Sequence, residues 1–137
     1  MSEAEEFVDE DMEPDPELNR ITNAVIGAAI AVHRELGPGH VEAIYGRALA
    51  IEFAHRGIAF QKEFPITLSY RGQAVGNGRL DFLVEGRVIL ELKSIEAIGP
   101  VQRAQMLTYL RITHHRLGII LNFNVARLVD GIRRIAN

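Results

Sequence analysis

The stretch from residue 80 to residue 93, LDFLVEGRVILELK, constrains the fold more than any other part of the sequence. It predicts two strands joined by a tight turn. In a strand, side chains alternate between two faces, so residues 88–93 present Val88, Leu90 and Leu92 on one face and Ile89, Glu91 and Lys93 on the other. Glu91 and Lys93 therefore project side by side from a strand that is otherwise apolar. Buried charges are costly unless they are paired or bound to a metal, so these residues are candidates for a functional site.

The length of the turn decides whether Asp81 joins Glu91. A two-residue loop would pair Asp81 with Leu90, on the face away from Glu91. We expect a three-residue loop over 85–87, which would bring Asp81 opposite Glu91, because Gly86 can supply the left-handed conformation that such a loop commonly needs. Two opposed carboxylates repel each other, and a divalent cation of the magnesium type would remove that repulsion. From spacing alone, a metal site and an Asp–Lys–Glu ion-pair cluster on a solvated sheet face are equally open.

The remaining pattern predicts the order α-α-β-β-β-α-β, followed by an edge strand. We expect helices over 16–36, 41–56 and 100–113, strands within 58–70 (interrupted near Pro65), 74–84, 88–93 and 117–121, a short helical turn over 125–128 and the edge strand over 131–135. In the second helix we expect Ile44, Ala48, Leu49 and Ile51 to face inward. A helix that links the third and fourth strands would make those two strands parallel.

Charge is distributed unevenly along the chain. Half of the 18 acidic residues lie in residues 1–17, which hold no Lys or Arg, so residues 18–137 carry nine acids against 15 bases. A basic body fits a polyanion as partner. We expect residues 1–15 to be a disordered acidic tail and residues 16–137 to be one domain. The chain has no cysteine and no apolar run long enough to span a bilayer, so we expect a cytoplasmic protein without disulfides, thiolate metal sites or a membrane partner.

Lysine is rare in this chain. Only Lys62 and Lys93 stand among the 15 basic residues, and the rest are arginine. A lysine ammonium is a compact donor whose pKa shifts when it is buried, and an arginine guanidinium does not have these properties. The lysine beside Glu91 is therefore a candidate for a functional role.

These residues resemble a known family. Asp81 and Glu91-Leu92-Lys93, on adjacent strands followed by a helix, resemble the PD-(D/E)XK nuclease superfamily. The segment GHVEAIY over 39–45 is similar to the G-x-x-E-x-x-Y signature of the GxxExxY family, which is assigned to that superfamily. The similarity continues through 32–39, 104–110, 121–123 and 130–134, and it covers roughly 18–136. One departure is Leu80, which stands where many members have the proline before the first acid.

The resemblance implies an α/β fold, a three-layer α/β/α arrangement with a central mixed sheet and a restriction-endonuclease-like αβββαβ core. It implies a Mg²⁺ or Mn²⁺ ion between Asp81 and Glu91. Lys93 would position or activate water near the phosphate, which makes Lys93, Glu91 and Asp81 the catalytic set. Glu42, on the helix before the sheet, would be an additional acidic metal ligand.

The resemblance also implies supporting residues. Gln105 and Tyr109, at i and i+4 on one helix face, would stand beside the site. Tyr45 closes the G-x-x-E-x-x-Y signature. For both tyrosines, a supporting role and a core position with a satisfied hydroxyl are equally open.

The implied function is a Mg²⁺-dependent nuclease acting on DNA or RNA. The alternative is a nuclease-fold module that binds nucleic acid or a protein partner with little or no catalysis, and a third is a subunit whose fold serves assembly. Nucleic acid is the expected partner, and a homodimer or a protein partner that brings substrate is compatible with a domain of this size.

Overall fold

The computed structural model describes Glu3 and residues 15–137, so the expected acidic tail lies outside the described residues except for Glu3 and Asp15. The elements follow the predicted order. They are α2 (Pro16–Leu36), α3 (Glu42–His55), β1 (Phe60–Tyr70), β2 (Gln73–Val84), β3 (Val88–Lys93), α4 (Pro100–Thr113), β4 (Leu117–Asn122), the 3-10 helix η1 (Leu128–Gly131) and β5 (Ile132–Ala136).

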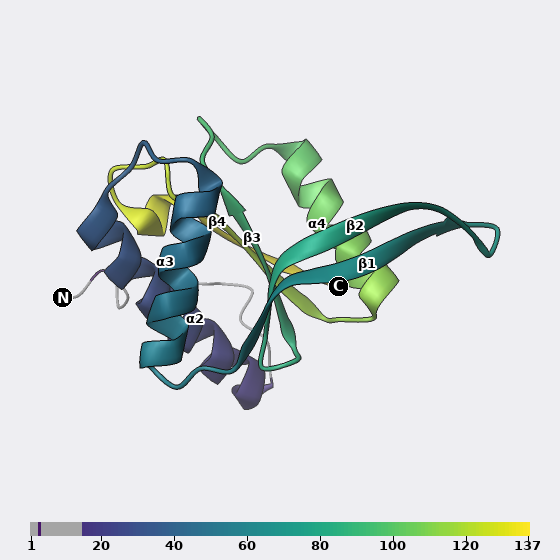
Figure 1. Ribbon diagram of the computed structural model, residues 1–137, viewed down its shortest axis with the longest axis horizontal. Coiled ribbons are helices and arrows are strands. Elements are labelled where there is room, and N and C mark those ends of the chain that lie inside the picture. The colour runs from purple at the N-terminus through teal and green to yellow at the C-terminus, as the bar shows by residue number, and fades with distance from the viewer. Residues whose placement is uncertain (1–2, 4–14) are drawn as a thin grey trace.

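The five strands form one mixed sheet in the order β1-β2-β3-β4-β5. Only β3 and β4 are parallel, and α4 links them as expected. The other three neighbouring pairs are antiparallel. Helices α2 and α3 cover one face of the sheet and α4 covers the other (Figure 1). This is the three-layer α/β/α arrangement with a central mixed sheet that the sequence led us to expect.

Each face of the sheet has its own core. The larger core joins the buried side chains of α2 and α3 to residues such as Phe82, Leu90 and Ile119. The smaller core joins Met106 and Leu110 of α4 to Ile89 and Ile120 on the opposite face. Alternation along β3 therefore serves both cores, as the sequence pattern of this strand indicates.

The start of α2 is held at the turn between β2 and β3. Asp15 caps the helix, because its Oδ1 accepts a hydrogen bond from the Glu17 backbone N–H at 2.9 Å. Its other oxygen, Oδ2, lies 2.7 Å from the Arg87 Nη2 atom. This contact ties the N-terminal helix to the hairpin that carries the candidate site.

The buried face of α3 differs from the expected one. Leu49 is buried and Ala48 half-buried, as expected, but Ile51 is 72% exposed and Ile44 is 38% exposed. Tyr45 and Phe53 take the inward positions, each with 0% of its surface exposed. The physical reason is the aromatic packing: Tyr45 stacks on Phe123, and Phe53 packs against Phe60 and Phe82.

Strand β1 is continuous through Pro65, which pairs with Arg79, so the expected interruption at the proline is wrong. A proline is tolerated here because β1 is an edge strand. The register of the β1–β2 ladder shifts later, between Leu68 and Ser69. At Glu63, whose φ is 57°, the ladder keeps its register but lacks one pair, between Lys62–Phe82 and Phe64–Leu80.

Two further features bear on the expectations. The short helical turn expected over 125–128 lies three residues later, as the 3-10 helix Leu128–Gly131, and the expected edge strand follows it as Ile132–Ala136. Of the helices that the structure describes, none combines the length and the apolar character that a bilayer crossing requires.

Candidate active site

The turn between β2 and β3 has the three-residue register. The ladder pairs Val84 with Val88, Leu83 with Ile89 and Phe82 with Leu90. Gly86 in the loop has a φ of 67°, in the left-handed region as expected, and Glu85 before it has a φ of 54°. Continued by one step, this register brings Asp81 to Glu91, so the expectation of a three-residue loop is confirmed.

Beyond the Phe82–Leu90 pair, side-chain hydrogen bonds connect the two strands. The Leu92 backbone N–H donates to Asp81 Oδ2 at 2.7 Å. In the other direction, the Asp81 backbone N–H donates to Glu91 Oε1 at 3.2 Å. Each strand therefore uses a main-chain donor to orient the carboxylate of the other, and the two acids lie close together where the strands separate.

The surroundings of these two acids disfavour their charged forms. Glu91 is 7% exposed, and its burial, followed by the charge of Asp81, raises the pKa of its carboxyl to about 8. Burial also raises the pKa of Asp81, and this effect outweighs the hydrogen bond from Leu92 and the charge of Lys93. The local positive charge is thus too small to keep both carboxylates ionised near neutral pH. A cation bound between them would supply the missing charge.

The ion-pair cluster that spacing also allowed is not formed. Among the residues that the structure describes, no ion pair joins the Lys93 ammonium to Asp81 or Glu91. The charge of Lys93 nevertheless lowers the pKa of both acids. Lys93 therefore acts on them through its charge without forming an ion pair with either.

The acids fit a hard divalent cation in donor type, because Mg²⁺ takes carboxylate oxygens and keeps several waters. Asp81 and Glu91 are the residues that would hold it. Glu42, the first residue of α3, is exposed, and its charge also raises the pKa of Glu91. Within the described part of the chain, however, no group of three or more His, Asp or Glu side chains stands close enough together to hold a metal. Glu42 therefore faces the pair from outside it.

The expected supporting residues occupy different positions. Tyr109 on α4 is half-buried, and its burial, followed by the charges of Glu91 and Asp81, raises the pKa of its hydroxyl. Gln105, one turn earlier on α4, is exposed.

Tyr45 lies in the core, and its hydroxyl is satisfied. The hydroxyl donates to the Gly37 carbonyl at 2.6 Å and accepts from the His40 backbone N–H at 3.2 Å. Its ring stacks on Phe123, with centroids 4.4 Å apart and planes at 10°. Tyr45 therefore fixes the loop that leads into Glu42 and acts on the site only through that loop.

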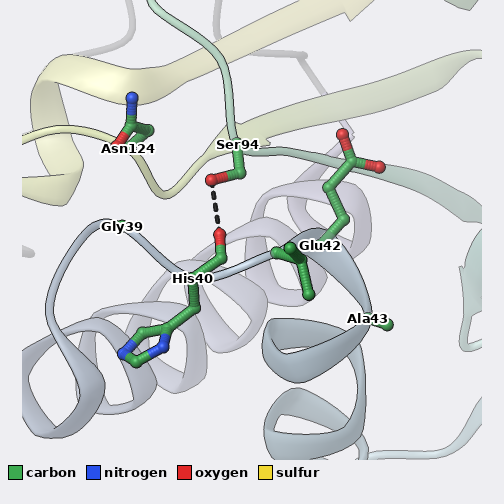
Figure 2. A pocket seen from close by; sticks show the side chains of 7 residues that line it. Gly39, His40, Glu42, Ala43, Ser94 and Asn124 are labelled. Carbon is green, nitrogen blue, oxygen red and sulfur yellow. Dashed lines mark hydrogen bonds between the residues drawn. The ribbon is translucent and has the colours of Figure 1, made fainter.

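Two hollows meet at the start of α3. The first has a volume of about 660 Å³ and is lined by Gly39, His40, Val41, Glu42, Ala43, Ser94 and Asn124. Figure 2 shows Ser94 closing one side of it, where its Oγ donates to the His40 carbonyl at 2.6 Å. The second hollow, of about 300 Å³, contains Asp81 in its lining and shares Glu42 and Ala43 with the first. Glu42 therefore stands where the first hollow continues toward Asp81.

Sequence reasoning assigned no role to Asn122, although Asn122 shapes the site. This side chain is 2% exposed at the end of β4. Its Oδ1 accepts from the Ile95 N–H at 3.1 Å and its Nδ2 donates to the Ile95 carbonyl at 2.9 Å. It thereby fixes the segment that follows Lys93. The sequence feature that could have identified Asn122 is its position as a polar residue directly after the apolar run 117–121.

Two basic residues near Asp81, Lys62 and Arg79, also had no role assigned from the sequence. Lys62 and Arg79 both lower the pKa of Asp81 through their charge and line the same hollow. The rarity of lysine pointed to Lys62, but nothing in the sequence placed it near Asp81.

Comparison with known families matches residues 19–135 to the model of the PD-(D/E)XK nuclease superfamily. The matched range runs from the first turn of α2 into β5 and so contains every residue of the candidate site. No curated protein and no solved structure gives a significant match to the chain.

Proposed function

Because the chain belongs to the PD-(D/E)XK nuclease superfamily, we propose that it is a Mg²⁺-dependent nuclease that hydrolyses phosphodiester bonds of DNA or RNA. The observation that carries the proposal is the pair Asp81 and Glu91, which meet from adjacent strands, are oriented by main-chain donors and have raised pKa values. Within the superfamily, the segment over 39–45 supports assignment to the GxxExxY family.

Phosphodiester hydrolysis requires neutralisation of the nonbridging oxygens, a nucleophile and stabilisation of the leaving oxygen. A bound Mg²⁺ or Mn²⁺ supplies Lewis acidity and lowers the pKa of water. Asp81 and Glu91 would hold the ion, and the N–H groups of Leu92 and Asp81 keep one oxygen of each carboxylate fixed. Lys93, which neither acid neutralises, donates to the attacking water or to a phosphate oxygen.

The other expected residues take supporting parts in this proposal. Glu42 faces the pair from α3 and adds negative charge to the ion's surroundings. Tyr109, and Gln105 one turn earlier, would act from α4, where a hydroxyl and an amide can hold water or substrate. Tyr45 maintains the loop before Glu42. Residues 16–137 form the single functional domain, and the proposed location is the cytoplasm.

The test is cleavage of labelled DNA and RNA, single- and double-stranded, with Mg²⁺, Mn²⁺ or EDTA. Asp81→Asn, Glu91→Gln and Lys93→Met should each lower the rate by about 100-fold or more, because each removes charge that acts on the transition state. Glu42→Gln should have a smaller effect, because Glu42 lies outside the pair. Arg111→Gln changes an exposed residue of α4 and serves as the control.

Full activity in Glu91→Gln would overturn the proposal. If the wild-type protein binds nucleic acid but no metal supports cleavage, the alternative is correct. The protein is then a nuclease-fold binding module, an outcome with which the excess of basic residues over 18–137 is compatible.

A further inference from the structure

The hollow beside Asp81 is lined by side chains of both signs from three elements. The charged residues in its lining are Glu42 and Arg47 of α3, Lys62 and Glu63 of β1, and Arg79 and Asp81 of β2. Neither Glu91 nor Lys93 lines it. The three cations of this lining therefore form a group separate from the lysine of the catalytic set, and we name Arg47, Lys62 and Arg79 the basic cluster.

Glu63 stands between two members of the basic cluster. Its Oε1 atom is 3.5 Å from the Lys62 ammonium and 3.9 Å from Arg79 Nη1. The Glu63 side chain is 54% exposed. Long ion pairs at such exposure contribute little, about 0–1 kcal/mol, so another anion can displace this carboxylate.

The backbone of β1 is in the left-handed region at Glu63. Its φ of 57° marks the point where the β1–β2 ladder loses a pair, between Lys62 and Phe64. This irregularity brings the neighbouring side chains Lys62 and Glu63 into the same hollow, although neighbours in a regular strand point to opposite faces.

Arg47 adds a charge without a partner. Among the described residues, no ion pair or side-chain hydrogen bond involves it. Of the three acids in the lining, Glu63 is the one that forms ion pairs with the basic cluster. Asp81 belongs to the candidate metal site, and Glu42 stands beside it.

Gly46 leaves room for Lys62 to reach the hollow. A Cβ atom at this position would lie 3.7 Å from Lys62 Cε and 3.8 Å from Leu92 Cδ1. An alanine methyl group at this position would make only ordinary van der Waals contact with the lysine side chain, and a longer side chain would take its space.

We propose that Arg47, Lys62 and Arg79 bind a backbone phosphate of DNA or RNA adjacent to the phosphate that is hydrolysed, and that Glu63 occupies the place of that phosphate in the free protein. The inference rests on the proposed function for the identity of the ligand. Two guanidinium groups and an ammonium match the charge and the acceptor oxygens of a phosphate. The acids on the other side of the hollow match the metal ion that the neighbouring phosphate needs.

The experiment measures binding without cleavage. Fluorescein-labelled 20-nucleotide probes (duplex DNA, the single DNA strand and the corresponding RNA strand) are titrated in EDTA over a series of salt concentrations, with anisotropy as the readout. Lys62→Met and Arg79→Gln should each raise the Kd about tenfold. The double variant should lower the slope of log K against log salt by about 0.7–0.9, the value for one lost phosphate contact. Arg111→Gln, the same change on α4, should leave both quantities unchanged.

Glu63→Gln tests the second half of the proposal. It removes the competing charge and keeps the side-chain size, so the Kd should fall several-fold while the salt slope changes little. Circular dichroism and the Tm of each variant show whether it is folded. Arg79 is 65% exposed in its side chain, so Arg79→Gln keeps the test valid if Lys62→Met fails to fold.

The outcomes separate this inference from the proposed function. If cleavage requires Glu91 but Arg79→Gln and Lys62→Met bind like Arg111→Gln, the phosphate subsite is wrong and the nuclease proposal stands. If no metal supports cleavage but these variants lose affinity, the subsite stands without catalysis. Absence of binding to every probe by the wild type would overturn the inference, and unchanged affinity in Glu63→Gln would overturn the role of Glu63.

Discussion

The carboxyl groups of Asp81 and Glu91 lie close together, Glu91 buried and Asp81 half-buried, and in the described part of the chain no cation forms an ion pair with either. Burial raises the pKa of each, and the charge of Asp81 adds to the effect on Glu91. At the scale of single residues, the pair therefore costs folding free energy whenever both groups are ionised. Such a cost is expected at a site that must bind a cation.

The pH dependence of stability follows from this pair. The pKa of Glu91 is raised from 4.5 to about 8 in the folded protein, so between these values the folded state holds a proton that the unfolded state has released. The stabilising contribution of Glu91 is therefore fully present below pH 4.5 and is lost as the pH rises through about 8. Without metal, the free energy of unfolding should fall over this interval by an amount on the order of a few kcal/mol.

Glu91→Gln should remove most of this dependence. The amide oxygen can still accept from the Asp81 N–H, but the side chain has no charge to lose. Chemical denaturation in EDTA at pH 5, 7 and 9 should show a variant that gains on the wild type as the pH rises. Equal pH slopes for the two proteins would contradict the assigned environment of Glu91.

At the scale of elements, the close approach of α4 to the sheet depends on Gly118 of β4. A Cβ atom there would lie 2.3 Å from the Met106 Sδ atom and 2.9 Å from its Cγ atom. Met106 is 1% exposed in the smaller core, so it has little room to move. The glycine therefore sets the distance between α4 and the strands that carry Glu91 and Lys93.

Gly118→Ala should destabilise the protein by about 1–3 kcal/mol, the usual cost of overpacking a core. The Tm should fall by several degrees, on the order of 3–6 °C per kcal/mol for a domain of this size. Gly46→Ala is the matched control, because its Cβ would meet its nearest neighbour only at 3.7 Å, and it should leave the Tm unchanged or raise it. Similar losses in both variants would show that glycine flexibility, and not the approach of α4, explains the effect.

At the scale of the whole molecule, the site depends on segments distant in the sequence. Glu42 comes from α3, Asp81 and Glu91 from adjacent strands, and Tyr109 from the helix on the other face (Figure 1). In the unfolded chain these groups do not form a common site. A divalent cation that binds the assembled carboxylates should therefore stabilise the folded state alone.

Magnesium should accordingly raise the Tm of the wild-type protein. At about tenfold excess over its dissociation constant the gain is roughly 1.4 kcal/mol, or on the order of 3–6 °C. The rise should be larger at pH 8 than at pH 6, because protons compete for the same oxygens. Asp81→Asn should raise the Tm without metal but reduce the response to magnesium, since it relieves repulsion and removes a ligand.

Melting scans of both proteins, with magnesium and with EDTA at matched ionic strength, test this prediction. If Asp81→Asn is destabilising and the wild type responds to neither Mg²⁺ nor Mn²⁺, the two acids are a structural pair and the proposed metal site is wrong.

The order of the elements and the meeting of Asp81 with Glu91 could be predicted from the sequence, because both depend on local rules. Alternation in 88–93 decides which side chains share a face, and a glycine in the loop over 85–87 allows the three-residue register. The proline after Gly99 similarly marks the start of α4. These rules act within a few residues, so no knowledge of distant packing is required.

Tertiary structure alone decided which face of α3 is buried and which cations reach Asp81. Ile44 and Ile51 have the hydrophobicity for the core, but the aromatic rings of distant strands select Tyr45 and Phe53. Lys62, Arg79 and Arg47 lie on three elements, and the backbone at Glu63, with a φ of 57°, departs from the regular strand where they meet. Packing between elements involves pairs of residues far apart in the chain. Such contacts produce no repeating pattern in the sequence of either element, so local rules do not predict them.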